Sequence, residues 1–438
     1  MPSNPEINLS RRSFLEKSAA AAATTALVGS FPHILHGAEI QKPIKVALVG
    51  CGGRGSGAAS QALKADSDTQ LIAMGDVFQD RLDTSLSNLR ASFKDNPNKV
   101  KVTPETSFVG LDAIDKVLGM PEVDVVLLTT PPGFRPEHFE KAVRAGKHVF
   151  TEKPIAVDAP GYRRFMEAAK LSKQKGLGVQ SGFCWRSHYL EREVYKRILE
   201  DGQLGTVEAA HGTYLGGTPW SKPRQEGWKD LEYHLRNWIH MTWLSGDHII
   251  EQAIHTVDKM CWVFGDADPV GAQGMGGRQQ RVEDQYGNQW DHFSVVYDYG
   301  DDRKGFIMCR QQAGCWGDVS DYVYGTKGIL RKKSGTMAAM KFADGNTWKY
   351  DGPKNDMYQT EHDEFFASIR AGKPLNFSEK IAHSTMVGIL GRMAAYTGQP
   401  VTWEDAIKST EKLGPDKLDW NMTLPVQPVA MPGRTKFA

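Results

Sequence analysis

Cysteine is scarce in this sequence and shows no pattern. The five cysteines are scattered and odd in number, without the close spacing of zinc ligands: Cys51, Cys184, Cys261, Cys309 and Cys315. A disulfide framework or a structural zinc site needs paired or closely grouped cysteines. We therefore expect buried or incidental thiols and no metal site.

Net charge is also nearly absent, with 53 Lys and Arg residues against 52 Asp and Glu residues. Nucleic-acid binding proteins usually present an excess of positive charge, so we expect no such partner and favour a small neutral substrate. After the N-terminal segment, no apolar run approaches the roughly 20 residues that span a bilayer, so no membrane span is expected in a soluble mature protein. The 438 residues suggest two domains, because single cores rarely exceed about 250–300 residues.

The first forty residues have the layout of an export signal. Arg11 and Arg12 precede Phe14, and an apolar stretch follows from residue 19. The paired arginines are similar to those of twin-arginine signals, which export folded proteins. An alanine-rich first helix of the fold is the alternative, but the segment has no amphipathic period. We expect a signal over residues 1–38, the twin-arginine export machinery as a partner, and a periplasmic location.

A glycine-rich loop follows the first clear strand. The apolar run 44–49 leads directly into Gly50, and the spacing of residues 50–55 is G-x-G-x-x-G. In a strand-loop-helix context these glycines permit a tight turn, backbone approach to a pyrophosphate, and close packing of the following helix. Glycine-rich turns that bind nothing are the alternative. The candidate cofactor residues here are Gly50, Gly52, Gly53, Arg54 and Gly55.

Asp76 supports the dinucleotide interpretation. It ends a second strand over 70–75 and lies about 20 residues beyond Gly55, where an acidic side chain can bond the adenosine ribose. A helix cap is the simpler alternative for Asp76 alone. Because a carboxylate repels a 2′-phosphate, we expect NAD as the cofactor, with NADP less favoured.

The strands and helices alternate through the first half of the chain. An apolar strand over 123–128 precedes Thr130 and Pro131, and a helix over 137–145, which contains His138, leads to a strand at 148–150. Repeated β-α-β alternation predicts a doubly wound parallel sheet, with ligands at the carboxyl ends of its strands. We expect a Rossmann domain over 42–165, with Thr130, Pro131 and His138 as further cofactor contacts.

The motif Thr151-Glu152-Lys153-Pro154 comes next. With the glycine loop and Asp76, it resembles that of the Gfo/Idh/MocA oxidoreductases, and the resemblance extends over nearly the whole mature chain. The resemblance implies that Lys153 is the catalytic acid/base beside the nicotinamide, that Glu152 contacts the nicotinamide ribose, and that Pro154 shapes the turn.

Acid/base chemistry at Lys153 is also reasonable on physical grounds. Hydride removal from a carbinol carbon requires removal of the hydroxyl proton, and a cationic nicotinamide nearby favours the neutral lysine that can accept it. A lysine in a surface turn would be the default interpretation without its neighbours Glu152 and Pro154.

A second motif contains Glu251 and His255, four residues apart on a helix predicted over 248–264. The family resemblance implies Asp-x-x-x-His here, with the histidine near the reacting hydroxyl and the acid on the substrate. Glu251 departs from that pattern by one methylene, and a buried core histidine is the alternative for His255. The resemblance also implies that Arg186 lies on the nicotinamide side of the cleft, although a surface ion pair is equally consistent.

The segment 214–243 is rich in tryptophan: Trp220, Trp228, Trp238 and Trp243. Aromatic faces with polar neighbours suit a carbohydrate ring, and packing of a long loop is the alternative.

The second half of the chain has a different pattern. Strands are predicted over 206–214, 292–299, 304–311 and 321–324, with helices near 248–264, 361–371 and 382–396. Later strands without intervening helices should pair antiparallel. We expect an α/β protein with an N-terminal Rossmann doubly wound parallel sheet and a C-terminal α/β domain with a large open mixed, mainly antiparallel sheet. The C-terminal domain should cover 166–423 and an extended tail 424–438, and the resemblance implies a homo-oligomer through this sheet.

Together these features predict a sugar or sugar-derivative dehydrogenase with a tightly bound nicotinamide cofactor. One alternative is a redox-assisted hydrolase, lyase or epimerase that recycles its cofactor internally. Another is a cofactor-stabilised binding protein without turnover, against which the intact Glu152 and Lys153 argue.

Overall fold

The structure, a computed structural model, describes residues 42–436. The export signal expected over residues 1–38 lies outside the described residues. Among those that are described, no helix is long and apolar enough to cross a membrane.

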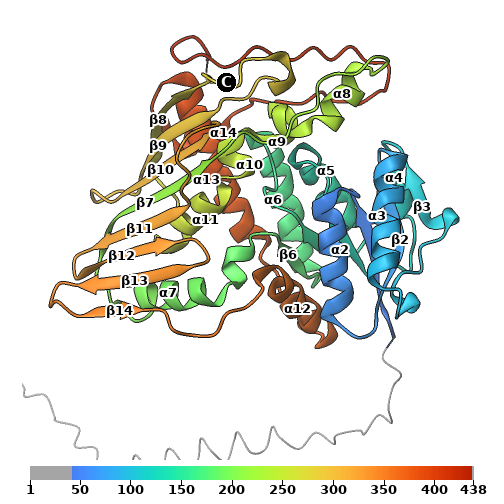
Figure 1. Cartoon of the computed structure of the whole chain (residues 1–438), viewed down its shortest axis with the longest axis horizontal. Coiled ribbons are helices and arrows are strands. Elements are labelled where there is room, and N and C mark those ends of the chain that lie inside the picture. Colours follow the sequence, from blue (N-terminus) through green and yellow to red (C-terminus); the bar gives the residue numbers. More distant parts are fainter. Residues whose placement is uncertain (1–41, 437–438) are drawn as a thin grey trace, which may run out of the picture. The chain divides into compact units, whose positions relative to one another are not determined.

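The N-terminal domain is built on a six-stranded sheet in the order β3-β2-β1-β4-β5-β6, with all neighbouring pairs parallel (Figure 1). This is the doubly wound Rossmann order, as the alternating pattern predicted. The strands are β1 (Ile44–Val49), β2 (Thr69–Asp76), β3 (Ser107–Val109), β4 (Val125–Leu128), β5 (His148–Thr151) and β6 (Val179–Ser181). The helices are α2 (Gly53–Ala65), α3 (Gln79–Ser92), α4 (Ala113–Leu118), α5 (Arg135–Arg144) and α6 (Ala159–Gln174).

The expected domain boundary at residue 165 falls before the last strand of the N-terminal sheet. Strand β6 pairs with β5 and completes the parallel sheet, so the N-terminal sheet extends to Ser181. A strand of three residues carries too little pattern to be assigned to one sheet from sequence, and only its pairing decides the matter.

The C-terminal domain is built on a nine-stranded sheet in the order β14-β13-β12-β11-β7-β10-β9-β8-β15. All neighbouring pairs are antiparallel except β7 with β10, so the sheet is mixed and mainly antiparallel, as predicted. Its strands are β7 (Val207–Gly216), β8 (Gly271–Gly277), β9 (His292–Asp298), β10 (Lys304–Gln311), β11 (Ser320–Gly325), β12 (Gly328–Lys333), β13 (Met337–Phe342), β14 (Thr347–Lys349) and β15 (Val401–Thr402). The strands missed from sequence are β8, β12, β13, β14 and β15. β8 is glycine-rich, β12 ends in three charged residues, β14 and β15 have three and two residues, and β13 does not alternate apolar and polar residues.

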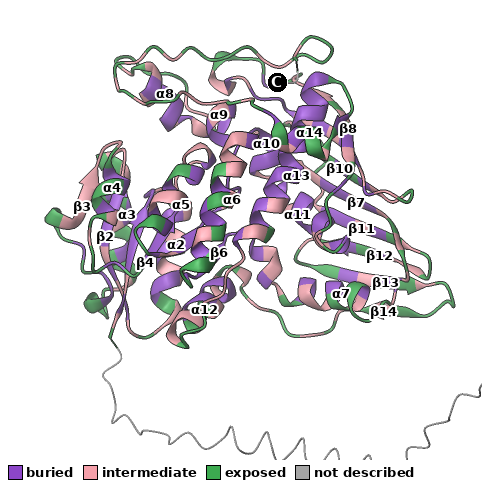
Figure 2. Ribbon diagram, turned by 180° about the vertical axis from the view of Figure 1, so that it is seen from behind, coloured by how far each residue is buried: buried purple, intermediate pink, exposed green. Residues whose placement is uncertain are grey.

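Several helices of this domain cover one face of the sheet. Nearly every residue of α13 (Ser378–Thr397) is buried, because it packs on β8 and β9 on one side and on α6 and α11 on the other (Figure 2). The other helices are α7 (Tyr189–Leu199), α8 (Asp230–Arg236), α9 (Thr242–Ser245), α10 (His248–Glu251), α11 (Ile254–Val263), α12 (Met357–Arg370) and α14 (Trp403–Lys408). The described tail residues 424–436 contain no helix or strand.

The single helix predicted over 248–264 is wrong. The structure has two helices there, α10 and α11, separated by residues 252–253. The apolar period continues across the break, so the sequence pattern does not reveal it.

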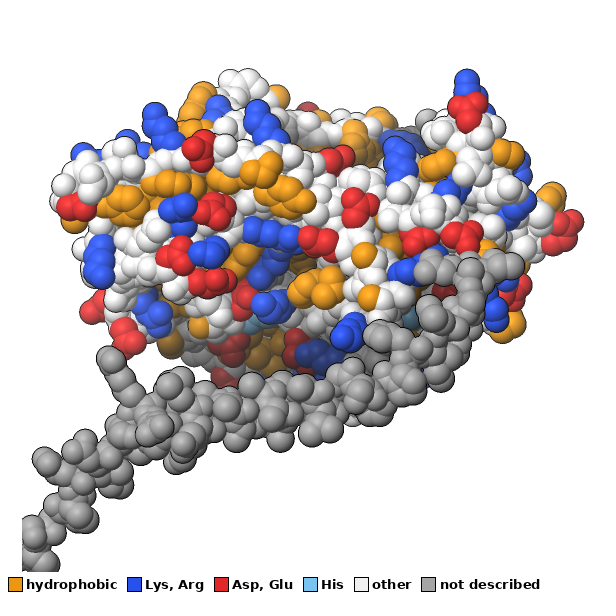
Figure 3. Space-filling model, turned by 90° about the horizontal axis from the view of Figure 1, so that it is seen from below, with side chains coloured by type: hydrophobic (Ala, Val, Ile, Leu, Met, Phe, Trp, Pro, Cys, Tyr) orange, Lys and Arg blue, Asp and Glu red, His pale blue; other side chains and the backbone are white. Residues whose placement is uncertain are grey.

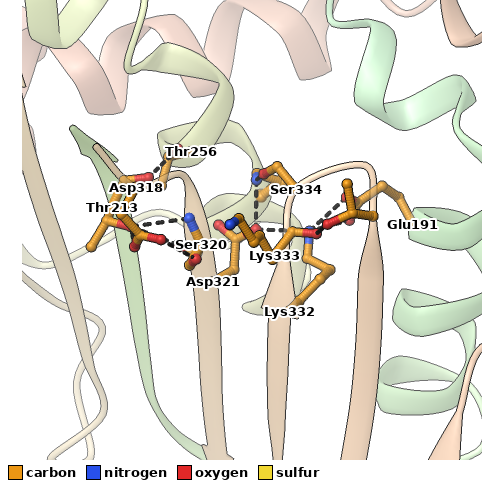
Figure 4. A network of polar contacts seen from close by, with 11 residues as sticks. Glu191, Thr213, Thr256, Asp318, Ser320, Asp321, Lys332, Lys333 and Ser334 are labelled. Carbon is orange, nitrogen blue, oxygen red and sulfur yellow. Dashed lines mark hydrogen bonds and ion pairs between the residues drawn. The ribbon is translucent and has the colours of Figure 1, made fainter. Parts of the chain in front are cut away.

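A buried network of alternating charges ties α7 and α11 to the sheet (Figure 4). The ammonium of Lys332 lies 2.5 Å from Glu191 and 2.7 Å from Asp321, and Asp321 also pairs with Lys259 at 2.5 Å. Burial alone would raise the pKa of Asp321, but the charges of Lys259 and Lys332 hold it below its usual value. Because a buried charge without a partner is costly, this network fixes the position of α11, which carries His255.

The surface shows no extended region of one charge on the face drawn in Figure 3, where Lys and Arg side chains are interspersed with Asp and Glu. This agrees with the near-zero net charge of the sequence.

Candidate active site

A cavity of about 790 Å³ lies at the carboxyl ends of the N-terminal strands and is closed by parts of the C-terminal domain. Its volume is in the usual range for small-molecule sites. Thirteen of the fourteen residues predicted for the site line it: Gly50, Gly52, Gly53, Arg54, Gly55, Asp76, Thr130, Pro131, His138, Glu152, Lys153, Glu251 and His255. The fourteenth, Arg186, does not.

The glycine loop forms a cradle at the start of α2. Gly50 has a φ of +96°, and a Cβ on Gly55 would lie 2.0 Å from the Gly50 carbonyl oxygen, so both positions require glycine. By contrast, a Cβ on Gly52 or Gly53 would meet nothing within 4 Å. No side chain caps the N-terminus of α2. Free backbone N–H groups beside open space are what a dinucleotide pyrophosphate needs, so these residues fit the cofactor.

Asp76 lies beside this loop at the end of β2. Its carboxylate accepts hydrogen bonds from the backbone N–H of Cys51 at 2.5 Å and of Phe78 at 2.9 Å. Burial raises the pKa of the carboxyl above its ordinary value, although these bonds favour the charged form. The two bonds fix a carboxylate at the end of the cavity where the sequence predicted the adenosine ribose.

The Glu-Lys-Pro turn places Lys153 in the cavity. The Lys153 ammonium donates to the Glu251 carbonyl oxygen at 2.6 Å and to Glu251 Oε1 at 3.1 Å. The peptide bond between Lys153 and Pro154 is cis. Lys153 and Glu251 are both largely buried, so their ion pair is shielded from solvent.

Two arginines surround Glu152. Arg54 Nε donates to Glu152 at 2.5 Å, and Arg135, which the sequence analysis missed, donates to the carbonyl oxygens of Pro154 at 2.5 Å and Thr130 at 2.7 Å. Burial alone would raise the pKa of Glu152, but the charges of Arg54, Arg135 and Lys153 lower it. Glu152 is therefore a fixed anion, and Arg135 holds the turn in place.

His255 faces the cavity from the start of α11. Desolvation, together with the charges of Lys153 and Lys259, lowers the pKa of its ring well below the ordinary value. The imidazole is therefore neutral at physiological pH and can accept a hydrogen bond or a proton. Its Nδ1 is buried without a hydrogen-bond partner among the described residues, and Phe183 packs edge-on against the ring.

His138 is a second neutral histidine, at the wall of the cavity. Burial lowers its pKa to about 4, and its Nδ1 lies 3.2 Å from the hydroxyl of Thr130. The two residues hold each other beside the turn that follows β4.

The structure does not bring Arg186 into the cavity with the other predicted residues. Its guanidinium bonds both carboxylate oxygens of Asp258, at 2.9 and 3.0 Å, and pairs with Asp266 at 2.6 Å. It also lies over the ring of Trp262. The Arg186 guanidinium thus has two carboxylates and an aromatic ring as partners. Through these contacts Arg186 holds the loop after β6 against α11, and it does not line the cavity.

Two tryptophans of the segment 214–243 line the cavity, as a ligand-binding role requires, and two pack among other apolar side chains. Trp220 and Trp238 line the cavity. Trp228 and Trp243 pack in a separate hydrophobic cluster with Leu231 and Leu244. Tyr214, Gln252 and Tyr358 also line the cavity and were not singled out from sequence, because isolated polar or aromatic residues carry no spacing signal.

Within residues 42–436, no group of three or more His, Cys, Asp or Glu side chains is placed to hold a metal ion.

Comparison with known proteins matches both domains to one family. Residues 44–183 match the model described as "Oxidoreductase family, NAD-binding Rossmann fold", and residues 193–331 match the GFO/IDH/MocA C-terminal domain. Together the two matches span more than half of the chain.

Curated relatives include sugar and polyol enzymes. The chain is 22% identical to inositol 2-dehydrogenase of Rhizobium meliloti, over 74% of this chain and 86% of that protein. It is 27% identical to 1,5-anhydro-D-fructose reductase of Ensifer adhaerens, over 67% and 84% of the two chains. It is 22% identical to 2,7-anhydro-N-acetylneuraminate hydratase of Escherichia coli, over 54% and 59%.

A solved structure has the same fold. The 3-ketoreductase from Actinomadura kijaniata, in complex with NADP and TDP-benzene, superposes with a TM-score of 0.62 at 17% identity and covers 81% of this chain and 98% of that one. The two family matches, the strand order and the glycine cradle agree, and the chain therefore belongs to the GFO/IDH/MocA family, with an NAD(P)-binding Rossmann domain at its N-terminal end.

Proposed function

We propose that this protein is an oxidoreductase that transfers a hydride between a carbinol carbon of a sugar or sugar derivative and a tightly bound nicotinamide cofactor. The observation that carries the proposal is the position of Lys153. It lies in the same cavity as the glycine cradle and His255, and it is paired with an acid from the other domain.

The residues support a division of tasks. When bound, the nicotinamide accepts or returns the hydride. In its neutral form, which a cationic nicotinamide nearby favours, Lys153 takes the hydroxyl proton as the carbinol carbon loses hydride and becomes a carbonyl. In the reverse direction the resulting ammonium returns that proton. His255, neutral and facing the cavity, is placed to accept a hydrogen bond from the same hydroxyl and orient it. Glu251 holds the Lys153 ammonium through charge and a hydrogen bond.

The cofactor assignment to NAD, rather than NADP, rests on Asp76. Its carboxylate is fixed by two backbone N–H donors, so a negative charge stands where a 2′-phosphate would approach. Electrostatic repulsion at this position favours NAD.

A carbohydrate substrate is supported by Tyr214, whose aromatic ring lines the cavity that also holds Lys153 and His255. The apolar C–H face of a sugar ring can pack on such a ring while its hydroxyls reach Lys153, Gln252 and His255. Both the inositol dehydrogenase and the anhydrofructose reductase relatives are named for polyhydroxylated substrates.

A second candidate is a hydratase, lyase, hydrolase or epimerase that oxidises and re-reduces one substrate. It is favoured by the hydratase relative of Escherichia coli. The two candidates differ in net turnover of the cofactor. A binding protein without turnover is the third, and the buried Lys153–Glu251 pair beside the cradle argues against it.

The test is to incubate purified protein with a panel of sugars and polyols and to follow the absorbance of the reduced nicotinamide cofactor. A net rise in reduced cofactor supports the dehydrogenase. Product formation without a net rise supports the second candidate. Absence of both, with cofactor bound, would contradict enzymatic function.

We also propose that two copies of the chain associate through the open face of the C-terminal sheet. Apolar side chains on this face are exposed, at 70% for Met275, 44% for Met308 and 43% for Tyr324. Ser294 pairs with both methionines across β9, so they lie on one row of the sheet. Sedimentation of the wild type against a Met308→Lys variant tests this, because a buried lysine would weaken the association.

Export by the twin-arginine route to the periplasm is a further part of the proposal. It is supported by Arg11 and Arg12 ahead of an apolar stretch, and by the need of a cofactor-dependent enzyme to fold around its cofactor before export.

A further inference from the structure

Part of the cofactor cavity is formed by a segment outside the Rossmann domain, residues 217–246, which we name the strap. It follows β7 and contains α8 and α9. Six of its residues line the cavity: Trp220, Ser221, Lys222, Leu235, Arg236 and Trp238. The same cavity is lined by Asp76, Val77, Phe78 and Arg81 of the Rossmann domain, the residues at the adenosine end.

The strap is tied firmly to the C-terminal domain. Asn237 Oδ1 accepts a hydrogen bond from the backbone N–H of Lys222 at 2.8 Å, and Asn237 Nδ2 donates one to the Gln285 carbonyl oxygen at 2.6 Å. Asp230 accepts the backbone N–H of Leu424 at 2.8 Å, from the chain segment that runs beside α8 in Figure 1. The strap also has its own hydrophobic cluster, built on Leu231, Tyr233, Leu235, Met241 and Leu244. It is therefore a preformed wall rather than a loose loop.

At the adenosine end the strap meets the Rossmann domain through apolar packing and an ion pair. Val77, Phe78 and Leu111 pack against the hydrophobic cluster of the strap. Arg236 pairs with Asp80 at 3.1 Å, and its guanidinium lies 3.9 Å from the centroid of the Phe78 ring. Trp420, from the chain segment beside the strap, also packs on Phe78. The Asp80 side chain is 60% exposed, so water competes for its bond to Arg236, and exposed pairs of this kind are weak.

The opposite end of the strap is held by a backbone contact. A Cβ on Gly133 would lie 2.3 Å from the carbonyl oxygen of Trp243, so the backbones touch there. The ring of Trp243 also packs against that of Phe134. The strap thus has a close backbone contact at one end. At the end next to Asp76 it has side-chain packing and an ion pair whose carboxylate is exposed.

We propose that the strap forms the outer wall of the adenosine-binding site, and that the Arg236–Asp80 ion pair is a latch that sets how fast the dinucleotide leaves. The inference rests on the proposed function, because it requires a dinucleotide in this cavity. An adenosine between Asp76 and the strap contacts Trp220, Leu235 and Trp238 on its outer side. Its departure requires these side chains to move away from Phe78, and the latch resists that movement.

Arg236 acts here as a tie between protein elements rather than as a phosphate ligand. It pairs with Glu232 on α8 as well as with Asp80, so its charge is already balanced by two carboxylates. Arg81 and Lys222 line the adenosine end of the cavity. Neither forms an ion pair with another described residue. Those two cations face the ligand, and Arg236 holds the wall.

The test measures release of NADH from the full mature protein. The protein is loaded with NADH and mixed rapidly with excess NAD, and the loss of bound-NADH fluorescence gives the release rate. Asp80→Asn should release NADH about threefold faster, because only the exposed ion pair is lost. Arg236→Gln should release it about tenfold faster, since the contact with the Phe78 ring is lost too.

Arg164→Gln is the matched control. Arg164 forms an exposed ion pair with Glu140 at 2.5 Å and does not line the cavity, so this variant should keep the wild-type rate. The double variant Asp80→Asn with Arg236→Gln should be no faster than Arg236→Gln alone, because both changes break one latch. Salt should accelerate release from the wild type and have little effect on the Asp80→Asn variant.

Equal release rates in the wild type, Asp80→Asn and Arg236→Gln, with all three folded by circular dichroism, would overturn the latch. Failure of the wild type to bind either NADH or NADPH would instead overturn the proposed function, and this inference with it. The equilibrium affinity for NADH and NADPH, measured on the same samples, separates these two results, because it shows whether the wild type binds a dinucleotide at all.

Discussion

Lys153 and Glu251, 98 residues apart in sequence, meet across the domain boundary in a buried ion pair in which Nζ lies 3.1 Å from Oε1 and 2.6 Å from the Glu251 carbonyl oxygen. One residue comes from the turn after β5 and the other from the end of α10. The family pattern has an aspartate at the position of Glu251. The longer glutamate side chain of this protein makes the contact with Lys153. The pair joins the cofactor domain to the domain expected to hold the substrate.

Replacing Lys153 by Met should remove the group that moves the hydroxyl proton and keep a side chain of similar length. We expect turnover to fall about 10²–10⁴-fold, the usual contribution of general acid/base catalysis. NADH binding should persist, because the glycine cradle is unchanged. Steady-state rates and fluorescence titration measure the two effects, and normal turnover with every accepted substrate would remove Lys153 from the mechanism.

Replacing Glu251 by Gln keeps a hydrogen-bond acceptor near Lys153 but removes the negative charge. Loss of a charge-assisted bond should lower kcat about 10- to 100-fold and change the pH dependence of kcat. Glu251→Asp, which has the residue of the family pattern, separates the effect of charge from that of length. If Glu251 only binds substrate, KM will rise while the pH profile of kcat keeps its shape.

Replacing Asp76 by Ser removes a carboxylate that repels a 2′-phosphate, so cofactor preference should move from NAD toward NADP. The expected change is in the ratio of the two affinities rather than in either value alone. Titration of the wild type and the variant with both reduced cofactors measures it. An unchanged or reversed ratio would show that Asp76 has a purely structural role at the loop.

The stability of the protein should fall in mild acid because of buried neutral histidines. His362 on α12 is fully buried, stacks on Phe150, and has no hydrogen-bond partner among the described residues for either ring nitrogen. Burial lowers its pKa to about 3. Since the unfolded chain takes up a proton near pH 6.5 and the folded chain does not, the contribution is complete above pH 6.5 and is lost as pH falls toward 3.

His362→Phe should therefore reduce the loss of unfolding free energy between pH 7 and pH 5 by about 2 kcal/mol. Urea unfolding at the two pH values measures this difference. Phe365→Leu, a nearby substitution without a titratable group, should destabilise the protein but keep the wild-type pH dependence. An identical pH dependence in His362→Phe and the wild type would mean that His362 is protonated when folded.

Changing both Arg11 and Arg12 to Lys should leave the protein in the cytoplasm, because the twin-arginine route requires the arginine pair. Wild-type protein recovered from the native periplasm should release nearly one nicotinamide cofactor per chain on denaturation, since that compartment offers little free cofactor. Fractionation and cofactor assay measure the two results. Undiminished export of the double variant would contradict the export route, and cofactor-free periplasmic protein would contradict folding around the cofactor.

Local motifs carried most of what could be predicted from sequence. The glycine loop, Asp76 and the Glu-Lys-Pro turn are short segments at strand ends, and in a parallel sheet all strand ends on one edge converge. Thirteen of the fourteen predicted residues therefore line one cavity. His255 and Glu251 were placed correctly in that cavity even though the helix predicted to hold them is broken.

Arg186 is the predicted residue that does not line the cavity, and its position has a different origin. A position in the chain shows which loop an arginine belongs to, but not which way its long side chain turns. Asp258 and Asp266, far along the chain, attract it away from the cavity, and nothing in the local sequence around Arg186 indicates these partners.

The sequence by itself determined that the first domain has a doubly wound parallel sheet, where the cofactor cradle lies, and which lysine lies in the cavity. These features depend on residue types that backbone geometry and phosphate chemistry require locally. The tertiary structure alone decided that Glu251 reaches Lys153, that β6 belongs to the first sheet, and that residues 217–246 wall the adenosine end with Arg236 on Asp80. These are contacts between segments distant in sequence, and their geometry is set by how two separately folded cores pack against each other.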